Sequence, residues 1–414
     1  MPSPSISSLS CSKIDAGGVL AERPALAAEL AREMEVTEAA GLKRRLRIIE
    51  GAQQNVVSLA GREVVLLCSN NYLGLANRTE VVEAAARATR DFGAGAVSSR
   101  LISGHMSAHA ALEERLAEWK GTEAALVFST GYQANIGVIS SLVGPGDVVV
   151  SDELNHASLI DGCRLSRADV AIYRHNDADH LRGVLAARRG SRRVLVITES
   201  VFSMDGDIAP LADIAAATRE HGGWLMVDEA HGAGVFGPCG AGVAAELGLG
   251  DSVDIHMGTL GKALGSFGAY VAGSRALIDH LINRARSFIF STGLPPSAAA
   301  AAEAAIAILQ REPDLGLGLR RRARDLGLRL RRAGIAVTNL DSQILPILIG
   351  DARATVAVAE ALLERGYYVA AIRPPTVPEG TSRLRLSLMA THDDAQIGGV
   401  ERALVELLAA GGAS

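Results

Sequence analysis

From Val64 onward, short apolar runs alternate with longer stretches that have helical spacing. Ten or more residues separate most of the apolar runs, with helical spacing over, for example, 79–91, 107–119 and 211–221. The runs themselves are 64–68, 124–128, 147–151, 193–198, 224–228, 253–257 and 268–273. Continuously apolar strands joined by helices are typical of crossover units, in which helices cover both faces of a parallel sheet. The sequence therefore predicts an α/β fold with a mostly parallel sheet.

The pattern changes after Pro295 and Pro296. The expected elements there are helices over 297–311 and 319–333, a strand over 344–349, a helix over 352–365, strands over 367–372 and 383–388, and a helix over 393–409. This order predicts a smaller α+β domain, and a chain of 414 residues is long enough for more than one core. Before the large domain come about twenty Ser-, Pro- and Gly-rich residues and a charged helical segment, 23–47. We expect an N-terminal part over 1–62, a large domain over 63–295 and a small domain over 296–414.

Composition argues against several classes of function. The net charge of −5 and the pI of about 6.1 give no reason to expect nucleic-acid binding. The four cysteines, Cys11, Cys68, Cys163 and Cys239, lie far apart without CxxC spacing, which argues against a zinc site or a disulfide framework. The N-terminus lacks the pattern of a signal peptide, and the longest apolar stretch, 295–309, is interrupted by Glu303 and too short to span a bilayer. We expect a cytoplasmic protein that binds neither membranes nor nucleic acid.

One lysine stands among glycines and apolar residues in the segment GTLGKALGSFG, residues 258–268. The 41 basic residues include only four lysines, Lys13, Lys43, Lys120 and Lys262. Lys262 is either a solvated loop lysine or a chemically active amine. The second interpretation has a physical basis, because a desolvated lysine can lose its proton at accessible pH whereas an arginine cannot.

Polar residues also follow several predicted strands at their carboxyl ends, where open α/β sheets bind ligands. Gly131 opens a helix whose first N–H groups could hold a phosphate. The other residues in such positions are His156, Glu199, Ser203, Asp205, Asp207, Asp228 and His231. Each alone is explained equally well as a helix cap, a turn or a packing residue. Their order along the chain is more informative than any one of them.

The order of motifs along the chain resembles that of the pyridoxal-phosphate (PLP) enzymes of the aspartate-aminotransferase fold, PLP fold type I. The motifs are, in this order, a phosphate-type turn, a histidine after a strand, an Asp-x-x-His and a lone lysine in a glycine loop. From about Arg44 to the C-terminus the chain is similar to the α-oxoamine synthases. The motifs that carry this resemblance are SNNYLGL (69–75), GAGAVSSRLISGHMSAHAALEERLAEW (93–119), TESVFSMDGDIAPL (198–211), VDEAHGAGVFG (227–237), GTLGKALGSFG (258–268) and RLRLSLMATH (383–392). Within that family, the stretch AIRPPTVPEGTSRLRLSL (371–388) most resembles the 8-amino-7-oxononanoate synthases of biotin biosynthesis.

The resemblance implies PLP as cofactor and gives roles to individual residues. Lys262 would form the Schiff base and transfer protons, Asp228 would pair with the pyridine nitrogen, and His156 would stack on the ring. The residues around the rest of the cofactor would be His231 and Ser203 near O3′, Gly131, Tyr132 and Thr259 at the phosphate, and Ser291 or Thr292 from the second subunit of a homodimer. The substrate residues would be Asn70 and Arg385 at the amino-acid carboxylate, together with Arg44 and Thr376.

The same resemblance implies condensation of L-alanine with a pimeloyl thioester and loss of carbon dioxide. The acyl carrier is either coenzyme A or an acyl carrier protein. Another branch of the family, using glycine or serine, is the alternative, and the RPPTVP stretch argues against it. A nucleotide-binding oxidoreductase would need a GxGxxG turn that the chain lacks. A non-catalytic member of the fold would not need Lys262, Asp228 and Arg385.

Two segments leave alternatives open. Many relatives have glycines where Val97 to Arg100 stand, so the family's substrate contacts transfer less well to that segment. In RLRLSL the alternation puts Arg383 and Arg385 on one face of a strand. Either both arginines face solvent, or Arg385 binds a carboxylate through the two parallel hydrogen bonds that a guanidinium offers.

Overall fold

The computed structural model describes residues 24–409, and the contacts of the chain divide it into two compact units, Met1–Arg47 and Ile48–Ser414. In the first unit, helix α2 spans Pro24–Ala39. The charged helical segment expected over 23–47 is therefore shorter than predicted. Gly41 has a φ of 70°, a left-handed conformation that ends a helix readily. The first twenty residues and Cys11 lie outside the described residues.

The centre of the second unit is a seven-stranded sheet in the order β4-β10-β9-β8-β7-β5-β6. Strands β5 to β9 pair in parallel, and β10 pairs antiparallel with both β4 and β9. The strands are β4 (Ala124–Phe128), β5 (Val148–Asp152), β6 (Asp169–Tyr173), β7 (Val194–Glu199), β8 (Trp224–Asp228), β9 (Ile255–Thr259) and β10 (Ala269–Gly273). The predicted mostly parallel sheet is confirmed. Strand β6 was not among the predicted runs, because it lies at the edge of the sheet and only Ala171 and Tyr173 are buried in it.

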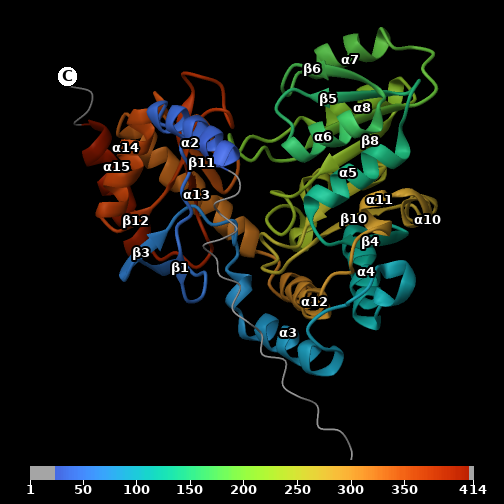
Figure 1. Cartoon of the computed structure of the whole chain (residues 1–414), viewed down its shortest axis with the longest axis horizontal. Coiled ribbons are helices and arrows are strands. Elements are labelled where there is room, and N and C mark those ends of the chain that lie inside the picture. The colour runs from blue at the N-terminus through green and yellow to red at the C-terminus, as the bar shows by residue number, and fades with distance from the viewer. Residues whose placement is uncertain (1–23, 410–414) are drawn as a thin grey trace, which may run out of the picture. The chain divides into compact units, whose positions relative to one another are not determined.

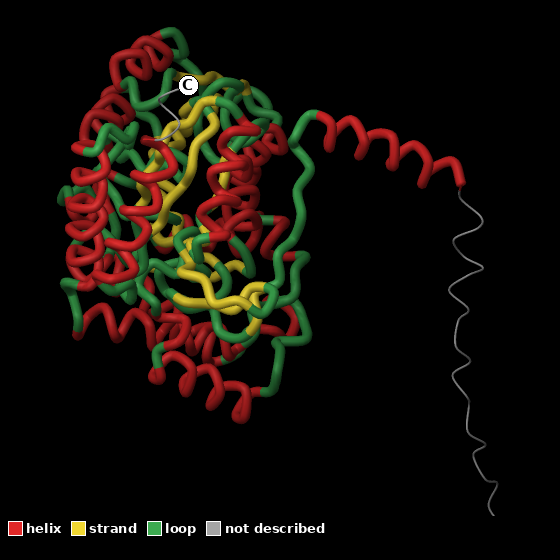
Figure 2. The backbone as a smooth tube through the Cα atoms, turned by 90° about the vertical axis from the view of Figure 1, so that its left-hand side faces the viewer, coloured by secondary structure: helices red, strands yellow, loops and turns green. Residues whose placement is uncertain are grey.

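Helices cover both faces of this sheet, and the strands are visible between them in Figure 2. Successive side chains of β4, such as Ala125 and Leu126, enter two different apolar clusters on opposite faces of the sheet, which is why β4 is apolar at every position. The helices of this region are α4 (Ser107–Lys120), α5 (Gly131–Leu142), α6 (Ala157–Ser166), α7 (Ala178–Ala186), α8 (Leu211–Glu220), α9 (Val243–Glu246), α10 (Arg275–Arg284) and α11 (Arg286–Ile289). Short turns are η2 (Arg100–Gly104, π-helical), η3 (Pro238–Gly240) and η4 (Gly250–Ser252).

The remaining elements form two smaller sheets with their own helices, apart from the green crossover helices in Figure 1. One sheet has the order β1-β2-β3-β12 and the other β11-β14-β13. Their strands are β1 (Ile49–Glu50), β2 (Val56–Leu59), β3 (Arg62–Leu66), β11 (Ile344–Gly350), β12 (Tyr367–Tyr368), β13 (Ala370–Ile372) and β14 (Ser382–Ser387). The helices that pack with these sheets are α13 (Leu315–Arg332), α14 (Ala352–Glu364) and α15 (Asp394–Ala409). Helix α12 (Pro296–Arg311) packs instead on α4 and on α3 (Thr79–Phe92), which follows the short turn η1 (Leu75–Asn77).

The strand expected over 64–68 is β3, and it pairs with β12 from the C-terminal part instead of joining the seven-stranded sheet. The chain before and after the large sheet thus meets in one small sheet. The division at residues 62 and 295 stays a prediction. Within 24–409, no helix has both the length and the apolar character needed to cross a membrane.

Candidate active site

The predicted polar residues gather at the carboxyl ends of the central parallel strands. His156 follows β5 and Lys262 follows β9, while Glu199 and Asp228 are the last residues of the adjacent strands β7 and β8. Glu199 and Asp228 are also register partners. The structure therefore brings together groups that are up to 106 residues apart in the sequence, at the edge of the sheet where α/β proteins bind ligands.

Close packing of two glycine turns holds the loop that carries Lys262. Gly265 has a φ of 63°, and a side chain there would overlap the backbone nitrogen of Ala76. Gly234, with a φ of 86°, leaves room for Ala263, whose Cβ would lie 2.5 Å from an added Cβ. Gly265 within the loop and Gly234 opposite Ala263 thus allow the close approach that fixes the loop around Lys262.

The amine of Lys262 loses its proton more readily than that of an ordinary lysine. Burial lowers its pKa to about 8, with a further contribution from the charge of Arg385, while the carboxylates of Asp228 and Glu199 oppose the shift. A lysine with this pKa has a substantial neutral fraction near physiological pH. The loop therefore presents an amine that can act as a nucleophile or a base.

A chain of hydrogen bonds leads from Lys262 into the interior. Its Nζ lies 2.8 Å from Nε2 of His231, and Nδ1 of that ring lies 2.7 Å from the hydroxyl of Tyr72. Burial, together with the nearby charges of Lys262 and Arg385, holds the pKa of His231 well below its ordinary value. His231 is therefore a neutral imidazole that can donate through one nitrogen and accept through the other.

Arg385 lies at the end of this chain and is almost completely buried. Its Nε donates to the carbonyl oxygen of Ser203 at 2.5 Å, and Nη2 donates to the Tyr72 hydroxyl at 3.1 Å. Both terminal nitrogens also lie within 3.4 Å of Oδ1 of Asn70. The predicted pair of Asn70 and Arg385 is therefore in contact.

The carboxylate of Asp228 is fixed by groups from two directions. Oδ1 accepts the backbone N–H of Ala230, and Oδ2 accepts Nδ2 of Asn135, each at 2.9 Å. Asn135 also donates to the hydroxyl of Ser158 at 2.9 Å, and that hydroxyl lies 2.8 Å from Nδ1 of His156. One polar network thus connects Asp228 to the imidazole of His156, whose residue is largely exposed.

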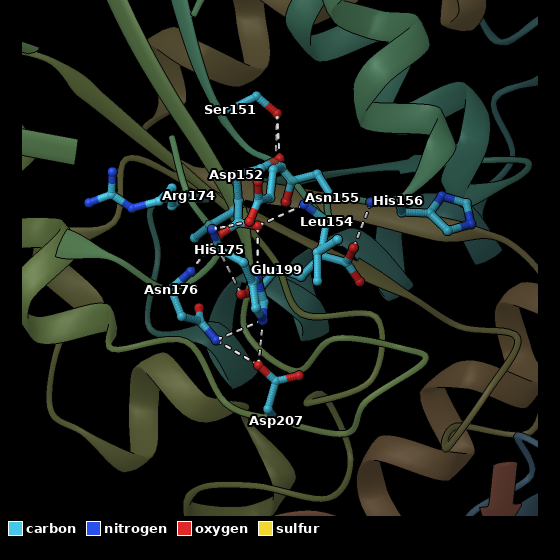
Figure 3. A network of polar contacts seen from close by, with 12 residues as sticks. Ser151, Asp152, Leu154, Asn155, His156, Arg174, His175, Asn176, Glu199 and Asp207 are labelled. Atoms are coloured by element: carbon cyan, nitrogen blue, oxygen red, sulfur yellow. Dashed lines mark hydrogen bonds and ion pairs between the residues drawn. The ribbon is translucent and has the colours of Figure 1, made fainter. Parts of the chain in front are cut away.

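Glu199 fixes the backbone at His156. Its Oε1 accepts the backbone N–H of His156 at 2.6 Å, a contact drawn in Figure 3. Burial raises the pKa of Glu199 well above its ordinary value, and the neighbouring charge of Asp228 adds to this. Two carboxyl groups at adjacent strand ends therefore differ in their surroundings, since Asp228 has two N–H donors on its carboxylate.

The start of α5 contains the predicted phosphate-binding residues Gly131 and Tyr132. Thr130 caps the helix by accepting the N–H of Gln133 at 3.1 Å, and the first N–H groups of any helix have no partner within it. The Tyr132 hydroxyl donates to Asp161. The hydroxyl of Thr259, another predicted phosphate residue, donates to the carbonyl of Gly268 at 3.0 Å.

Ser291 and Thr292 lie against the start of α5 of the same chain. The Ser291 hydroxyl accepts Nε2 of Gln133 at 3.2 Å, and the Thr292 carbonyl accepts the hydroxyl of Ser129 at 3.0 Å. Both residues were predicted to serve a second subunit, and that role stays a prediction.

Arg383 and Thr376 lie away from Lys262. Arg383 is buried and forms an ion pair with Asp205, so the alternative in which both arginines of the strand face solvent is wrong. Thr376, Arg383 and Ser203 line a cavity of about 490 Å³ in which Lys262 has no part. Arg44 lies in the separate N-terminal unit, and its substrate role stays a prediction.

Comparison with known proteins places these features in a family. The sequence matches the class I and II aminotransferases over residues 62–404. Over 376 residues it is 54% identical to the 8-amino-7-oxononanoate synthase of Anaeromyxobacter dehalogenans, covering 91% of this chain and 94% of that protein. The chain belongs to the class I and II aminotransferases, in the group of the 8-amino-7-oxononanoate synthases.

Solved structures of two named enzymes have the same fold as this chain. A serine palmitoyltransferase from S. paucimobilis with bound PLP and myriocin is 33% identical, with a TM-score of 0.88 over 96% of this chain and 100% of that chain. An 8-amino-7-oxononanoate synthase from Francisella tularensis is 27% identical, with a TM-score of 0.73 over 84% of this chain and 98% of that chain. The predicted PLP fold type I is confirmed.

Sequence reasoning did not single out three residues of the site, Tyr72, Asn135 and Ser158. Tyr72 and Asn135 lie within motifs that were recognised, SNNYLGL and the start of α5, and Ser158 lies two residues after His156. All three are buried polar residues within apolar surroundings. Their burial is visible only in the structure, so no pattern along the sequence marks them, although buried polar groups are kept where they have partners.

Proposed function

We propose that this protein is a PLP-dependent enzyme that condenses L-alanine with a pimeloyl thioester, releases carbon dioxide and forms 8-amino-7-oxononanoate for biotin biosynthesis. The observation that carries the proposal is the convergence of Lys262, Asp228 and Arg385 on one site in a chain 54% identical to a protein of that name. The individual roles below are part of the proposal.

The residues present fit PLP by the chemistry of their donor groups. An amine, a fixed carboxylate and an exposed imidazole surround one place at the sheet edge, and a helix N-terminus lies at the start of α5. Gly131 packs closely against Met257 at that helix start, because an added Cβ would lie only 3.1 Å from the methionine methyl group. When bound, PLP withdraws electrons from the Cα atom of the amino acid and stabilises a negative charge on it.

Lys262 holds the cofactor and handles the Cα proton. Its pKa of about 8 makes the neutral amine available for both tasks at moderate pH. His231, 2.8 Å from Nζ, orients the amine and can share its proton. Because the imidazole itself stays neutral, it does not repel a protonated lysine.

Asp228 and His156 hold the cofactor ring. The two N–H donors on Asp228 fix the orientation of its carboxylate, which would pair with the pyridine nitrogen of PLP and favour its protonated state. His156 lies at the N-terminus of α6, where Ser158 and the backbone contact of Glu199 fix its position. Its imidazole would pack against the ring of the bound cofactor.

Arg385 and Asn70 bind the carboxylate of L-alanine. The Nη atoms of Arg385 point toward Asn70 and Tyr72, while Nε is anchored on Ser203. A guanidinium fixed at Nε can present its outer nitrogens to a carboxylate in a defined orientation. This orientation decides which bond at Cα is aligned for cleavage.

The functional unit is a homodimer. Large apolar side chains are exposed beside Ser291 and Thr292: Val97 is 90% exposed, Ile102 81% and Phe290 69%. The segment that contains Val97 and Ile102 is joined to the segment that contains Phe290 by a β-bridge between Ser99 and Thr292, so these side chains belong to one region. Exposed apolar groups in a cluster are typical of subunit contacts. Ser291 and Thr292 would reach the cofactor phosphate of the neighbouring subunit.

One assay tests the proposed reaction. Purified protein is supplied with L-alanine, glycine or L-serine, each with pimeloyl-CoA and with a pimeloyl-carrier protein. We expect carbon dioxide release and 8-amino-7-oxononanoate with L-alanine and at least one of the two acyl donors. Preferential turnover of glycine or L-serine would assign the protein to another branch of the family, and no turnover with any pair would overturn the proposal.

A further inference from the structure

Four groups form an unbroken line from the lysine to the carboxylate-binding arginine. The sequence of atoms is Lys262 Nζ, His231 Nε2 and Nδ1, the Tyr72 hydroxyl, and Nη2 of Arg385, with separations of 2.8, 2.7 and 3.1 Å. The Tyr72 hydroxyl also lies 3.1 Å from Oδ1 of Asn70. Tyr72 is completely buried, so its hydroxyl depends on protein groups for hydrogen bonding, and Gln343 is a further, neutral partner.

The Tyr72 hydroxyl has a single hydrogen, so it can donate to only one of two neighbouring acceptors at a time. A phenol has one hydrogen to donate and can accept hydrogen bonds as well. Arg385 can only donate to it, and Asn70 Oδ1 can only accept from it. The remaining partner, Nδ1 of His231, is therefore a donor when Tyr72 donates to Asn70, and an acceptor when Tyr72 donates to the ring.

The two arrangements have opposite consequences for Lys262. With the ring proton on Nδ1, Nε2 is free to accept a hydrogen bond from a protonated Lys262. With the ring proton on Nε2, that bond is lost and a protonated Lys262 faces an N–H group. The direction of the Tyr72 hydroxyl therefore selects between favouring and disfavouring the charged lysine.

We propose that Tyr72 is a positioning residue that sets which ring nitrogen of His231 carries the proton, and so couples the carboxylate site at Arg385 and Asn70 to the proton affinity of Lys262. A carboxylate bound there offers Tyr72 a further acceptor on the side of Asn70. The hydroxyl then points away from His231, Nδ1 keeps the ring proton, and Lys262 becomes a better base when the amino acid is in place. This second step rests on the proposed role of Arg385, whereas the first does not.

The other charged groups around this line do not provide the same link. Asp228, Glu199 and Arg385 act on Lys262 through their charges, and Lys262, Arg385 and His156 act on His231 in the same way. Around Tyr72 the charged neighbour is Arg385, while Gln343 supplies a neutral hydrogen bond. The backbone carbonyl of His231 accepts Nε2 of Gln343 at 2.9 Å, which fixes the ring beside Tyr72. Among the hydrogen bonds of residues 24–409, those of the Tyr72 hydroxyl reach both the ring and the carboxylate site.

The test measures the pKa of Lys262 in the full-length chain freed of cofactor. Four lysines make this practical, since acetylation of each can be followed by mass spectrometry over a range of pH, with Lys43 as internal reference. In Tyr72→Phe, the ring nitrogen loses its acceptor and the charged lysine loses a hydrogen bond. We expect the pKa of Lys262 to fall by about 0.5 to 1 unit, the equivalent of one hydrogen bond. Nitrogen NMR of labelled histidine should show a shift of His231 toward the Nε2–H form.

Two further variants keep the inference falsifiable. Asn70→Ala removes the competing acceptor, so Tyr72 donates to His231 and the pKa of Lys262 should fall in the same direction; this variant decides the question if Tyr72→Phe does not fold. Tyr270→Phe is the matched control, because Tyr270 is also fully buried and its hydroxyl has no hydrogen-bond partner among the described residues. It should leave the pKa unchanged.

In the wild type, the unreactive carboxylate propionate should raise the pKa of Lys262 more than it does in Tyr72→Phe. Equal effects in both proteins would remove the coupling. An unchanged pKa and an unchanged tautomer in both Tyr72→Phe and Asn70→Ala would overturn the inference as a whole. These measurements need no turnover, so they stand or fall separately from the proposed reaction.

Discussion

Asn135 and Asp228 are joined by a hydrogen bond of 2.9 Å between an amide nitrogen of helix α5 and a carboxylate oxygen at the end of strand β8. The same helix begins at Gly131, in the predicted phosphate-binding turn. Helix α5 therefore holds both the predicted phosphate-binding turn and the carboxylate of Asp228. The distance between the two ends of the proposed cofactor site is set by the helix and not by a flexible loop.

Asn135→Ala should weaken PLP binding by at least about tenfold, because a hydrogen bond to a charged group contributes about 1.5–3 kcal/mol and its loss lets the Asp228 carboxylate rotate. The measurement is a titration of cofactor-free protein with PLP, followed by absorbance. Asn283→Ala is the control, since Asn283 is exposed and bonds a nearby backbone carbonyl. Equal PLP affinities for wild type and Asn135→Ala would contradict the positioning role of this residue.

The pKa of Lys262 predicts how PLP capture depends on pH. A lowered pKa means that the neutral amine, which reacts with the cofactor, predominates above about pH 8. The rate of capture by cofactor-free protein should therefore rise with pH and level off just above 8, and Lys262→Arg should show no covalent capture while Lys43→Arg behaves as wild type. A rate that keeps rising toward pH 10.5 would show an ordinary, solvated lysine.

Arg385→Lys should raise the KM for L-alanine at least about tenfold and leave PLP affinity nearly unchanged, because lysine keeps the charge but cannot make two parallel hydrogen bonds to a carboxylate. Arg383 is not a silent control for this variant, since it is buried and paired with Asp205. Arg164→Lys serves instead, on an exposed surface pair with Asp161. If Arg385→Lys and Arg164→Lys gave the same small change in KM, the carboxylate site would lie elsewhere.

The fold was predictable where the signal is local. Strand β4 is apolar at every position and β8 at every position before Asp228, and both were expected at their observed bounds. The edge strand β6 has two buried residues among five and gave no apolar run. The partner of β3 could not be foreseen either, because its pairing with β12 joins residues about 300 positions apart.

The reactive groups of the site could be predicted from the sequence, whereas the buried residues that hold them in place could not. Lys262, Asp228 and Arg385 stand out by residue type and by their motifs. Tyr72 contacts His231 across 159 positions, and Asn135 contacts Asp228 across 93. Their meaning depends on which buried polar groups the fold places side by side, and spacing along the chain contains no information about that.

His175 should stabilise the fold in a pH-dependent way. It bonds Asp152 at 2.9 Å and Asp207 at 2.7 Å, as Figure 3 shows. Burial alone would lower the pKa of His175, but the hydrogen bonds and charges of the two carboxylates raise it to about 10. A raised pKa means that the stabilisation is fully present below the unfolded-state value of about 6.5 and is lost as pH rises through about 10.

His175→Gln should therefore lower the urea midpoint most at pH 6, less at pH 8 to 9, and hardly at all above pH 10. The control is His280→Gln, because His280 bonds one backbone carbonyl and no carboxylate. A destabilisation by His175→Gln that is the same at every pH would mean that His175 contributes by packing and not by its charge.

The last prediction concerns the buried ion pair of Lys120 and Glu229, the residue that follows Asp228 in the chain. Both side chains are almost completely inaccessible, and Lys120 also donates to the carbonyl of Ala241. Glu229 accepts the backbone N–H of Ala244 at 3.0 Å, so the pair ties α4 to the segment after β8. Burial opposes the charge on Glu229, yet the positive charge of Lys120 brings its pKa below the ordinary value.

Lys120→Met should lower the free energy of unfolding by about 3–5 kcal/mol at neutral pH, because it leaves a buried carboxylate without its partner. A depressed pKa in the folded state means that this contribution is present above about pH 4.5 and is lost as pH falls through the lower folded-state value. The difference between wild type and Lys120→Met in urea unfolding should therefore shrink on acidification. Lys43→Met should cause a far smaller change, since Lys43 pairs with Glu38 at the surface.

The double variant Lys120→Met with Glu229→Leu should recover part of the loss, because it removes the unpaired buried charge. A double variant no more stable than Lys120→Met alone would show that lost packing, and not the unpaired carboxylate, causes the destabilisation.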